Sequence, residues 1–210
     1  MYSQEELLRQ CPKPEGEIGR YVGIKMNEKH LPLWEWGLSY ISIKENDHIL
    51  DAGCGGGEAI KLLANHSLTG LICGIDHSLE MIKLSFETTK DLINTKNIQI
   101  YQASISKLPF PSNTFNLVTA FETYAFWPDT LNDFKEVRRV LKPGGKLLLV
   151  HSAYKHKLFE ERNNYWSELF NITIHSPDEL KVILNNAGFI SIETNEKVEC
   201  NWLTVIANKE

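Results

Sequence analysis

After residue 47 the chain alternates between short apolar runs and longer amphipathic segments, and this alternation most restricts the fold. The apolar runs predict strands at residues 48–51, 71–75, 98–101, 115–121 and 146–150. Helical spacing of apolar residues predicts helices over residues 58–65, 78–92 and about 130–141, the last stopped by Pro143-Gly144-Gly145. Strands that alternate with helices are typical of an α/β fold, in which helices cover both faces of a parallel sheet.

The end of the chain follows a different pattern. Residues 189–194 and 198–207 both predict strands, and only three residues separate them. A parallel connection needs about a dozen residues or more, so these two strands pair antiparallel or do not pair with each other. We therefore predict a Rossmann-like, seven-stranded, mostly parallel sheet with an antiparallel C-terminal strand.

The first 45 residues precede this sheet. Residues 5–10 and 33–41 predict helices, and the prolines and glycines between them predict breaks (Pro12, Pro14, Gly16 and Gly19). The segment is rich in aromatic residues, which either pack a helix onto the sheet or cover a substrate pocket. We predict an N-terminal helical lid segment at residues 1–45 and one ligand-binding domain at residues 46–210.

Composition excludes several classes of function. The 210 residues carry a net charge of −5 with scattered basic residues, which argues against nucleic-acid binding. No apolar run is long enough to cross a bilayer, and the polar first residues do not resemble a signal peptide. Four cysteines without a C-x-x-C pair and seven dispersed histidines predict neither a disulfide framework nor a metal site. A reducing cytoplasm fits this composition best.

A glycine-rich turn, residues 51–57 (DAGCGGG), joins the first predicted strand to the first predicted helix. Such a turn lets a ligand approach the backbone closely and presents N–H groups at the start of a helix. A dinucleotide-binding turn has the pattern G-x-G-x-x-G, but here the third glycine position is Glu58. A carboxylate beside a pyrophosphate is repulsive, so an NAD(P)-dependent dehydrogenase is disfavoured.

S-adenosylmethionine (SAM) suits this turn better because it carries a carboxylate, an amine and a sulfonium but no phosphate. Asp51 is placed to receive the amine, and the backbone N–H groups of the turn to receive the carboxylate. Asp76, at the end of the second predicted strand, can accept hydrogen bonds from both ribose hydroxyls. The alternative for Asp76 is a structural acid in the N-cap region before Ser78.

Four segments occur in an order and spacing that resemble the class I SAM-dependent methyltransferases, particularly the broad family of the ubiquinone and menaquinone biosynthesis enzymes. They are residues 49–57 (ILDAGCGGG), 74–82 (GIDHSLEMI), 108–118 (LPFPSNTFNLV, similar to LPFPDNSFD) and 136–145 (EVRRVLKPGG). The resemblance covers about residues 47–152, and the terminal antiparallel strands also fit this fold.

The resemblance implies a role for individual residues. Asp51, Gly53 and Gly55 would hold the methionine end of SAM, and Asp76 the ribose. The adenine end would involve His77, Met81, Ser104, the backbone N–H of Ile105 and, at the end of the fourth strand, Phe121. Ser104 departs from the family, which often has an Asp at this position. A hydroxyl still accepts the hydrogen bond of the adenine amine, but without charge and so more weakly.

Methyl transfer is a displacement at a cofactor that is already activated, so the protein mainly supplies proximity and alignment. The resemblance names no catalytic residue. Residues at the carboxyl ends of strands are candidates because open α/β sheets bind ligands there. His151 and Tyr124 lie at such ends. Each also has a structural interpretation: His151 as a histidine hydrogen-bonded to the backbone, and Tyr124 as part of a hydrophobic wall. Tyr21 and His30 are weaker candidates.

The acidic surface and the aromatic residues favour a small organic methyl acceptor, with S-adenosylhomocysteine as the second product. Two alternatives remain open at this point. One is a SAM-binding sensor or partner subunit without catalysis, and the other is an NAD(P)-dependent dehydrogenase. The sequence predicts no oligomeric state.

Overall fold

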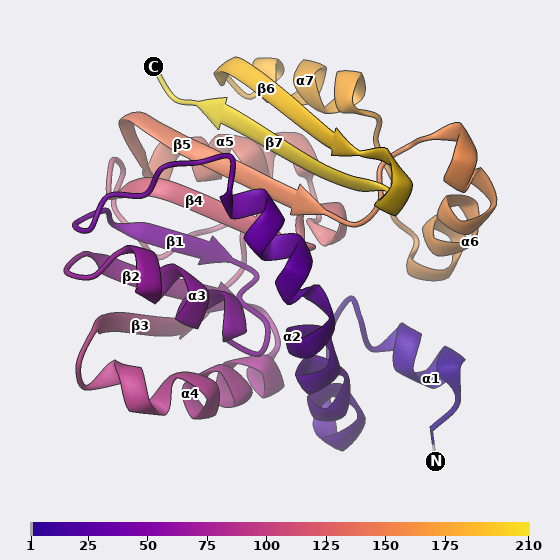
Figure 1. Ribbon diagram of the computed structural model, residues 1–210, viewed down its shortest axis with the longest axis horizontal. Helices are drawn as coiled ribbons and strands as arrows, with labels where there is room; N and C mark the ends of the chain where they lie inside the picture. Colours follow the sequence, from indigo (N-terminus) through magenta and orange to yellow (C-terminus); the bar gives the residue numbers. More distant parts are fainter. Residues whose placement is uncertain (1) are drawn as a thin grey trace. The chain divides into compact units, whose positions relative to one another are not determined.

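The computed structural model describes residues 2–210 and contains the seven expected strands (Figure 1). Their order is β3-β2-β1-β4-β5-β7-β6, which makes a mixed, mostly parallel sheet and confirms the predicted fold class. The chain forms two compact units, one ending at Ser104 and the other beginning at Ile105. Each unit is described below by itself.

The first unit contains three parallel strands and the helices that pack on them. Strand β2 (Leu71–Asp76) pairs with β1 (Ile49–Ala52) on one side and with β3 (Asn97–Gln102) on the other. Helices α3 (Glu58–His66) and α4 (Leu79–Ile93) connect consecutive strands. All these elements lie within one or two residues of their predicted bounds. The register places Asp51 beside Gly74, so the end of β1 lies close to the end of β2.

The N-terminal helices differ from the prediction. Helix α1 (Gln4–Arg9) is followed by α2 (Gly16–Leu38), which continues through several residues that disfavour helix, among them Gly19 and Pro32. Gly19 serves close packing, because an added Cβ would lie 2.5 Å from the carbonyl carbon of Pro14. Tertiary packing of α2 on α3 and α4 therefore outweighs the local preference of these residues.

The second unit contains the other four strands. Strand β4 (Phe115–Phe121) pairs parallel with β5 (Leu141–His151). Strand β7 (Trp202–Asn208) is antiparallel both to β5 and to β6 (Ile190–Lys197), with a short 3₁₀ turn, η3 (Val198–Cys200), before it. The antiparallel pairing expected for the chain end is thus confirmed. Strand β5 begins earlier than predicted because a register shift between Phe115 and Leu117 accommodates Pro143-Gly144-Gly145 within it.

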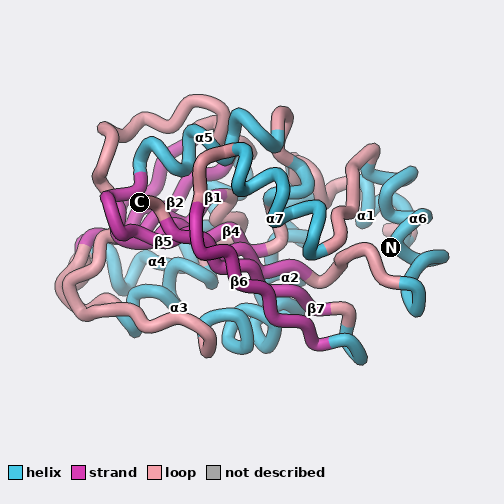
Figure 2. The backbone as a smooth tube through the Cα atoms, turned by 90° about the horizontal axis from the view of Figure 1, so that it is seen from above, coloured by secondary structure: helices cyan, strands magenta, loops and turns pink. Residues whose placement is uncertain are grey.

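Three α-helices belong to this unit: α5 (Thr130–Val140), α6 (Glu160–Phe170) and α7 (Pro177–Asn186). Two shorter turns are 3₁₀, η1 (Tyr124–Phe126) and η2 (Lys157–Phe159). Helices α5 and α7 contact each other, and they pack on β5 and on the terminal strands respectively (Figure 2). Helix α6 lies beyond the carboxyl end of β5 (Figure 1).

Two of the family-like segments contact each other in this unit. The Glu136 carboxylate accepts a hydrogen bond from the backbone N–H of Leu108 at 2.8 Å and pairs with the Arg139 guanidinium at 2.7 Å. Arg139 in turn donates to the carbonyl oxygen of Phe110 at 2.9 Å. The pair lowers the pKa of Glu136 and raises that of Arg139. These hydrogen bonds therefore hold the loop that precedes β4 against helix α5.

Candidate functional site

The glycine-rich turn leaves β1 in a tight loop. The N–H groups of Gly53 and Cys54 both donate to the carbonyl oxygen of Ile75, each at 2.8 Å. Gly53, Gly55 and Gly57 all have positive φ angles, of 89°, 49° and 87°. An L-residue rarely adopts this backbone, so the glycines are required for the path of the turn.

Two of these glycines have different surroundings. A Cβ added at Gly57 would lie 2.5 Å from Oγ of Ser85 on α4, so Gly57 lets the turn pack on that helix. A Cβ added at Gly55 would meet no atom within 4 Å. The backbone at Gly55 is therefore open to a ligand, whereas the backbone at Gly57 is covered by protein.

Asp76 connects the end of β2 to this turn. Its Oδ2 accepts a hydrogen bond from the N–H of Gly55 at 3.0 Å, and its Oδ1 accepts one from the N–H of Ser78 at 2.8 Å. Burial raises the pKa of the Asp76 carboxyl, and these two backbone donors oppose that shift. A carboxylate has about four acceptor sites, so Asp76 can accept a hydrogen bond from a ligand hydroxyl in addition to those from the backbone.

Asp51 and Cys54 lie deeper in the same region. Asp51 is 0% exposed at the carboxyl end of β1. Burial raises the pKa of the Cys54 thiol well above its usual range, and the nearby carboxylates of Asp76 and Asp51 act in the same direction. A thiol in this state is not a nucleophile at neutral pH. Cys54 is therefore a packing residue, and the chemistry of the turn belongs to its backbone and the two carboxylates.

The residues after Asp76 contact the N-terminal segment. The exposed His77 ring makes a 3.0 Å hydrogen bond through Nε2 with the carbonyl oxygen of Pro12, and the Ser78 hydroxyl donates to the carbonyl oxygen of Pro14. Met81 is buried with its Sδ and Cε against Gly23 of α2, where an added Cβ would lie 2.7 and 2.6 Å from them. The side chains of His77 and Met81 thus bind the N-terminal segment to α4.

Helix α2 also reaches the turn itself. Nδ2 of Asn27 donates to the carbonyl oxygen of Gly56 at 3.1 Å. A Cβ at Gly56 would lie 2.5 Å from the same amide group, so glycine is needed for this contact. Sequence reasoning did not identify Asn27, since an Asn within a predicted break carries no pattern. Of the weaker N-terminal candidates, Tyr21 is exposed with its ring 6.2 Å from that of Tyr2, and His30 lies against Trp34.

Two of the residues expected at the adenine end, Ser104 and Ile105, lie where the two units meet in sequence. Ser104 is exposed, and the preceding Ala103 donates its N–H to the carbonyl oxygen of Asp76 at 3.0 Å. Ile105 is buried at the start of the second unit. Phe121 is buried as the last residue of β4.

The second unit places two imidazole rings beside Tyr124, which is 1% exposed. The ring centroid of Tyr124 lies 5.0 Å from that of His151 and 6.2 Å from that of His175. Sequence reasoning identified Tyr124 and His151 but missed His175, which precedes the Ser176 cap of α7. The capping box of Ser176 and Glu179 marks the start of α7 next to His175, but only the fold places His175 near Tyr124.

Burial shifts the pKa of two of these rings, Tyr124 and His175. It raises the pKa of the Tyr124 phenol, and the carboxylates of Glu122 and Glu179 act in the same direction. Burial lowers the pKa of His175. Nδ1 of His151 accepts the backbone N–H of Ala153 at 3.1 Å, so the neutral ring carries its proton on Nε2.

Glu122 joins the ends of β4 and β5. Its φ angle is 63°, an uncommon backbone for a residue other than glycine. Its carboxylate accepts hydrogen bonds from the N–H of Ser152 and, at 2.8 Å, from the Ser152 hydroxyl. Arg162 of α6 donates to the carbonyl oxygen of Ser152 at 3.3 Å and lies over the rings of Phe159 and Trp166. These contacts fix the backbone that follows His151.

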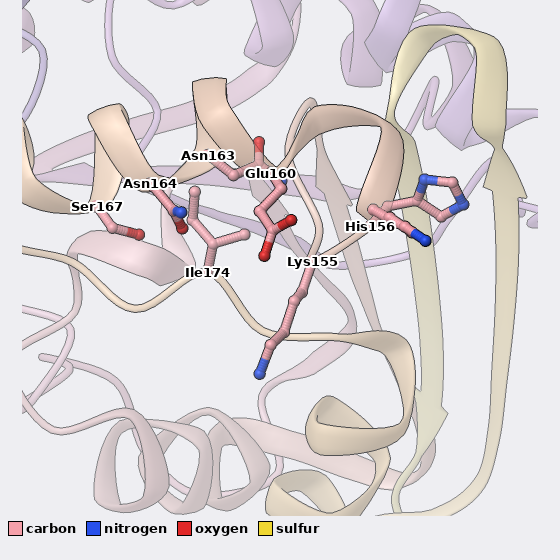
Figure 3. Close-up of a pocket in the computed structure, with 8 residues that line it drawn as sticks. Lys155, His156, Glu160, Asn163, Asn164, Ser167 and Ile174 are labelled. Atoms are coloured by element: carbon pink, nitrogen blue, oxygen red, sulfur yellow. The ribbon is translucent and has the colours of Figure 1, made fainter.

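A pocket of about 450 Å³ lies between the start of α6 and the segments beside it (Figure 3). Most of the residues that line it are polar, with charges of both signs: Lys155, His156, Lys157, Glu160, Asn163, Asn164, Ser167 and Ile174. Lys155 pairs with Glu179 at 3.0 Å, and Asn163 donates to the carbonyl oxygen of Tyr154 at 2.8 Å. Asn163 therefore also supports the fold of this region.

Within residues 2–210, no group of three or more His, Cys, Asp or Glu side chains is arranged to hold a metal ion. No helix described there is long and apolar enough to span a membrane.

Comparison with known proteins identifies the chain as a relative of methyltransferases. A family model described as a methyltransferase domain matches residues 50–149. The demethylmenaquinone methyltransferase of Staphylococcus carnosus is 30% identical over 176 residues, which cover 73% of this chain and 72% of that protein.

Solved structures share the fold. A SAM-dependent methyltransferase from Aquifex aeolicus matches with a TM-score of 0.76 at 21% identity, covering 91% of this chain and 98% of that one. Phosphoethanolamine N-methyltransferase 2 of Haemonchus contortus, solved with SAM, matches with a TM-score of 0.72 at 18% identity, covering 84% of this chain and 52% of that one.

Proposed function

The chain belongs to the class I SAM-dependent methyltransferases, and we propose that it transfers the methyl group of SAM to a small organic acceptor. The observation that carries this proposal is the similarity to a demethylmenaquinone methyltransferase along 72% of that protein's length. The net charge of −5 supports a small acceptor rather than a nucleic acid. Demethylmenaquinone is accordingly the first acceptor to test.

The residues present fit the cofactor. The open backbone at Gly55 and the spare acceptor sites of Asp76 are what a ligand with ribose hydroxyls requires. The residues proposed to hold SAM are Asp51, Gly53 and Gly55 at its methionine end, Asp76 at its ribose, and His77, Met81, Ser104, Ile105 and Phe121 toward its adenine. When bound, SAM supplies an electrophilic methyl carbon, and its sulfur keeps the electron pair of the bond that breaks. The protein's part is to bind and orient the two reactants.

Aromatic side chains after β4 support an acceptor with apolar surface. Trp127 is buried with its ring 5.2 Å from that of Phe134, and the ring of Phe126 lies 5.8 Å from that of Phe170 of α6. Tyr124 and His151 add polar groups to this apolar region. An organic acceptor with a ring and a polar substituent suits this mixture better than a highly charged one.

The N-terminal segment, residues 1–45, is proposed to act as a lid on the cofactor. Three contacts support this role: Asn27 with Gly56, His77 with Pro12, and Ser78 with Pro14. All three join the segment to the turn or to residues that directly follow Asp76. Cofactor binding and the position of the segment are therefore expected to influence each other.

We also propose that the protein works in the reducing cytoplasm. Cys54, Cys73 and Cys200 are free thiols. Burial raises the pKa of Cys73 to about 12, which suits a packing residue rather than a disulfide partner.

Thermal unfolding with SAM, S-adenosylhomocysteine and NAD tests the ligand. The first two should raise the unfolding temperature and NAD should not. A screen with methyl-labelled SAM then tests the reaction, with demethylmenaquinone and a panel of phenols and amines as acceptors. Stabilisation by SAM without label transfer to any acceptor would favour a sensor or partner subunit instead.

A further inference from the structure

One face of helix α2 lies against α4, and Asn27 is the residue of this face that reaches the glycine-rich turn. Residues 20, 23 and 27 share the face because their spacing of three and four residues places them in one row of a helix. The Arg20 guanidinium pairs with the Glu87 carboxylate at 2.5 Å, and Gly23 packs closely on Met81. The close packing one turn before Asn27 therefore determines where the Asn27 side chain lies.

The side-chain amide of Asn27 uses one of its two polar atoms within the protein. Its Nδ2 donates to the carbonyl oxygen of Gly56 at 3.1 Å. Its Oδ1 lies over the same residue, since a Cβ added at Gly56 would be 2.8 Å from it. Among residues 2–210 no group donates a hydrogen bond to this Oδ1. Asn27 therefore holds a hydrogen-bond acceptor beside the turn that the protein itself does not use.

The turn offers a hydrogen-bond donor at the same residue. The N–H of Gly56 has no acceptor in the part of the chain that the structure describes, although Gly56 is buried. The other four N–H groups of residues 53–57 are bonded within the protein, to the carbonyl oxygens of Ile75 and Cys54 and to the Asp76 carboxylate. Buried backbone N–H groups without an acceptor are rare in folded proteins, so this one indicates a partner from outside the chain.

The charges near the turn favour a cationic group of the ligand. Burial is the main cause that raises the pKa of the Cys54 thiol, and the carboxylates of Asp76 and Asp51 add to it, so both negative charges act on the turn. The Asn27 oxygen adds an acceptor for a cation without adding a third negative charge. The N–H of Gly56 is suited to an anionic group. The methionine end of SAM carries both kinds of group, an ammonium and a carboxylate on one carbon.

We propose that Asn27 is a cofactor-binding residue whose Oδ1 accepts a hydrogen bond from the ammonium at the methionine end of SAM, while the N–H of Gly56 donates to the carboxylate of that end. The bond from Nδ2 to Gly56 holds the amide so that Oδ1 stays free for the ligand. Asp51 remains the charged partner of the ammonium. This inference rests on the proposed function and deepens it, because the N-terminal segment then contacts SAM directly and selects ligands with a free amine.

The test uses two ligands that differ only in this amine: S-adenosylhomocysteine and its analogue without the α-amine. Calorimetry on the full chain compares the wild type, Asn27→Ala and Lys29→Ala, a control at an exposed residue of the same helix. Alanine has the highest helix propensity, so both variants keep α2. Asn27→Ala should weaken binding of S-adenosylhomocysteine by about tenfold or more, as loss of a hydrogen bond to a charged group does, and that of the analogue by less than about threefold. Lys29→Ala should change neither affinity.

Two results would overturn the proposal. Equal losses for both ligands in Asn27→Ala would show a structural role of Asn27, because a displaced helix weakens both alike. An unchanged affinity for S-adenosylhomocysteine would show that Asn27 does not bind the cofactor. Failure of the proposed function is distinct, because it appears as absence of label transfer by a wild type that still binds S-adenosylhomocysteine.

A second measurement follows the N–H of Gly56 and requires no analogue. The full chain with ¹⁵N-labelled glycine is titrated with S-adenosylhomocysteine and followed by NMR. The amide proton of Gly56 should move further downfield than those of Gly53, Gly55 and Gly57, because these three are already bonded in the free protein and Gly56 gains a bond to a carboxylate. A Gly56 amide that moves no more than the other three would refute its contact with the carboxylate.

Discussion

The Asp76 carboxylate accepts the backbone N–H of Gly55 at 3.0 Å, so the end of β2 fixes the middle of the glycine-rich turn. The same carboxylate accepts the N–H of Ser78 at the start of α4. One side chain therefore holds two backbone segments in place and is proposed to bind the ribose as well. A structural role for Asp76 at the start of α4 is therefore compatible with the proposed role in binding the ribose.

Asp76→Ala should weaken SAM binding by more than tenfold. The change removes the acceptor for two ribose hydroxyls and releases the N–H of Gly55, which costs several charge-assisted hydrogen bonds. Isothermal calorimetry with SAM measures this directly. Glu80→Gln, in the first turn of α4, is a suitable control because it also removes one partly buried carboxylate, which pairs with Lys83 at 3.7 Å. Equal affinities for the wild type and Asp76→Ala would rule out the ribose role.

Ser104→Asp should leave SAM affinity unchanged or increase it. Ser104 is exposed, so an aspartate fits without disturbing a core, and a carboxylate accepts the adenine amine more strongly than a hydroxyl does. The measurement is again calorimetric, with Ser104→Ala as the paired variant that removes the acceptor. Loss of binding in Ser104→Asp would refute the placement of adenine beside this residue.

The strands of this fold were predictable because apolar runs and the glycine turn are local signals. The helix of residues 16–38 was not, since Gly19 and Pro32 disfavour helix locally and are tolerated through packing on α3 and α4. Helix α6 offered almost no apolar face, as Asn163 is its buried residue. Hydrogen bonds from Asn163 and Arg162 to the backbone after β5 hold it instead.

Only some residues of the candidate site could be expected from local sequence patterns. Asp51, Gly55 and Asp76 were expected from a motif within one strand–turn–helix unit and the strand after it. Asn27 and His175 were not, because each reaches its neighbours only through the fold, across 29 residues to Gly56 in the case of Asn27. The capping box of Ser176 and Glu179 could have located the start of α7 in the sequence, and thereby His175 beside it.

Gly55→Ala and Gly57→Ala should separate ligand binding from stability. Both glycines have positive φ, so each substitution strains the backbone by about 1 kcal/mol or more. At Gly57 the new methyl group also lies 2.5 Å from Ser85 Oγ, whereas at Gly55 it meets nothing within 4 Å. Urea unfolding should therefore show the larger loss for Gly57→Ala. Calorimetry measures the loss of SAM affinity in each variant. The ratio of this loss to the loss of unfolding free energy in the same variant should be larger for Gly55→Ala than for Gly57→Ala. The reverse order in both measurements would contradict the open backbone at Gly55.

The lowered pKa of His175 should make the protein less stable as the pH falls below about 6.5. In the unfolded chain this histidine gains a proton near its ordinary pKa of about 6.5, whereas in the folded chain it gains one only at lower pH. Between these two values the unfolded chain binds more protons, so stability rises with pH in that window and is fully regained above it. His175→Gln removes this contribution. The difference in urea midpoint between pH 7.5 and pH 5.5 should thus be smaller in His175→Gln than in the wild type, while His66→Gln keeps the wild-type difference. An identical pH dependence in all three proteins would show that His175 titrates alike in the folded and unfolded chain.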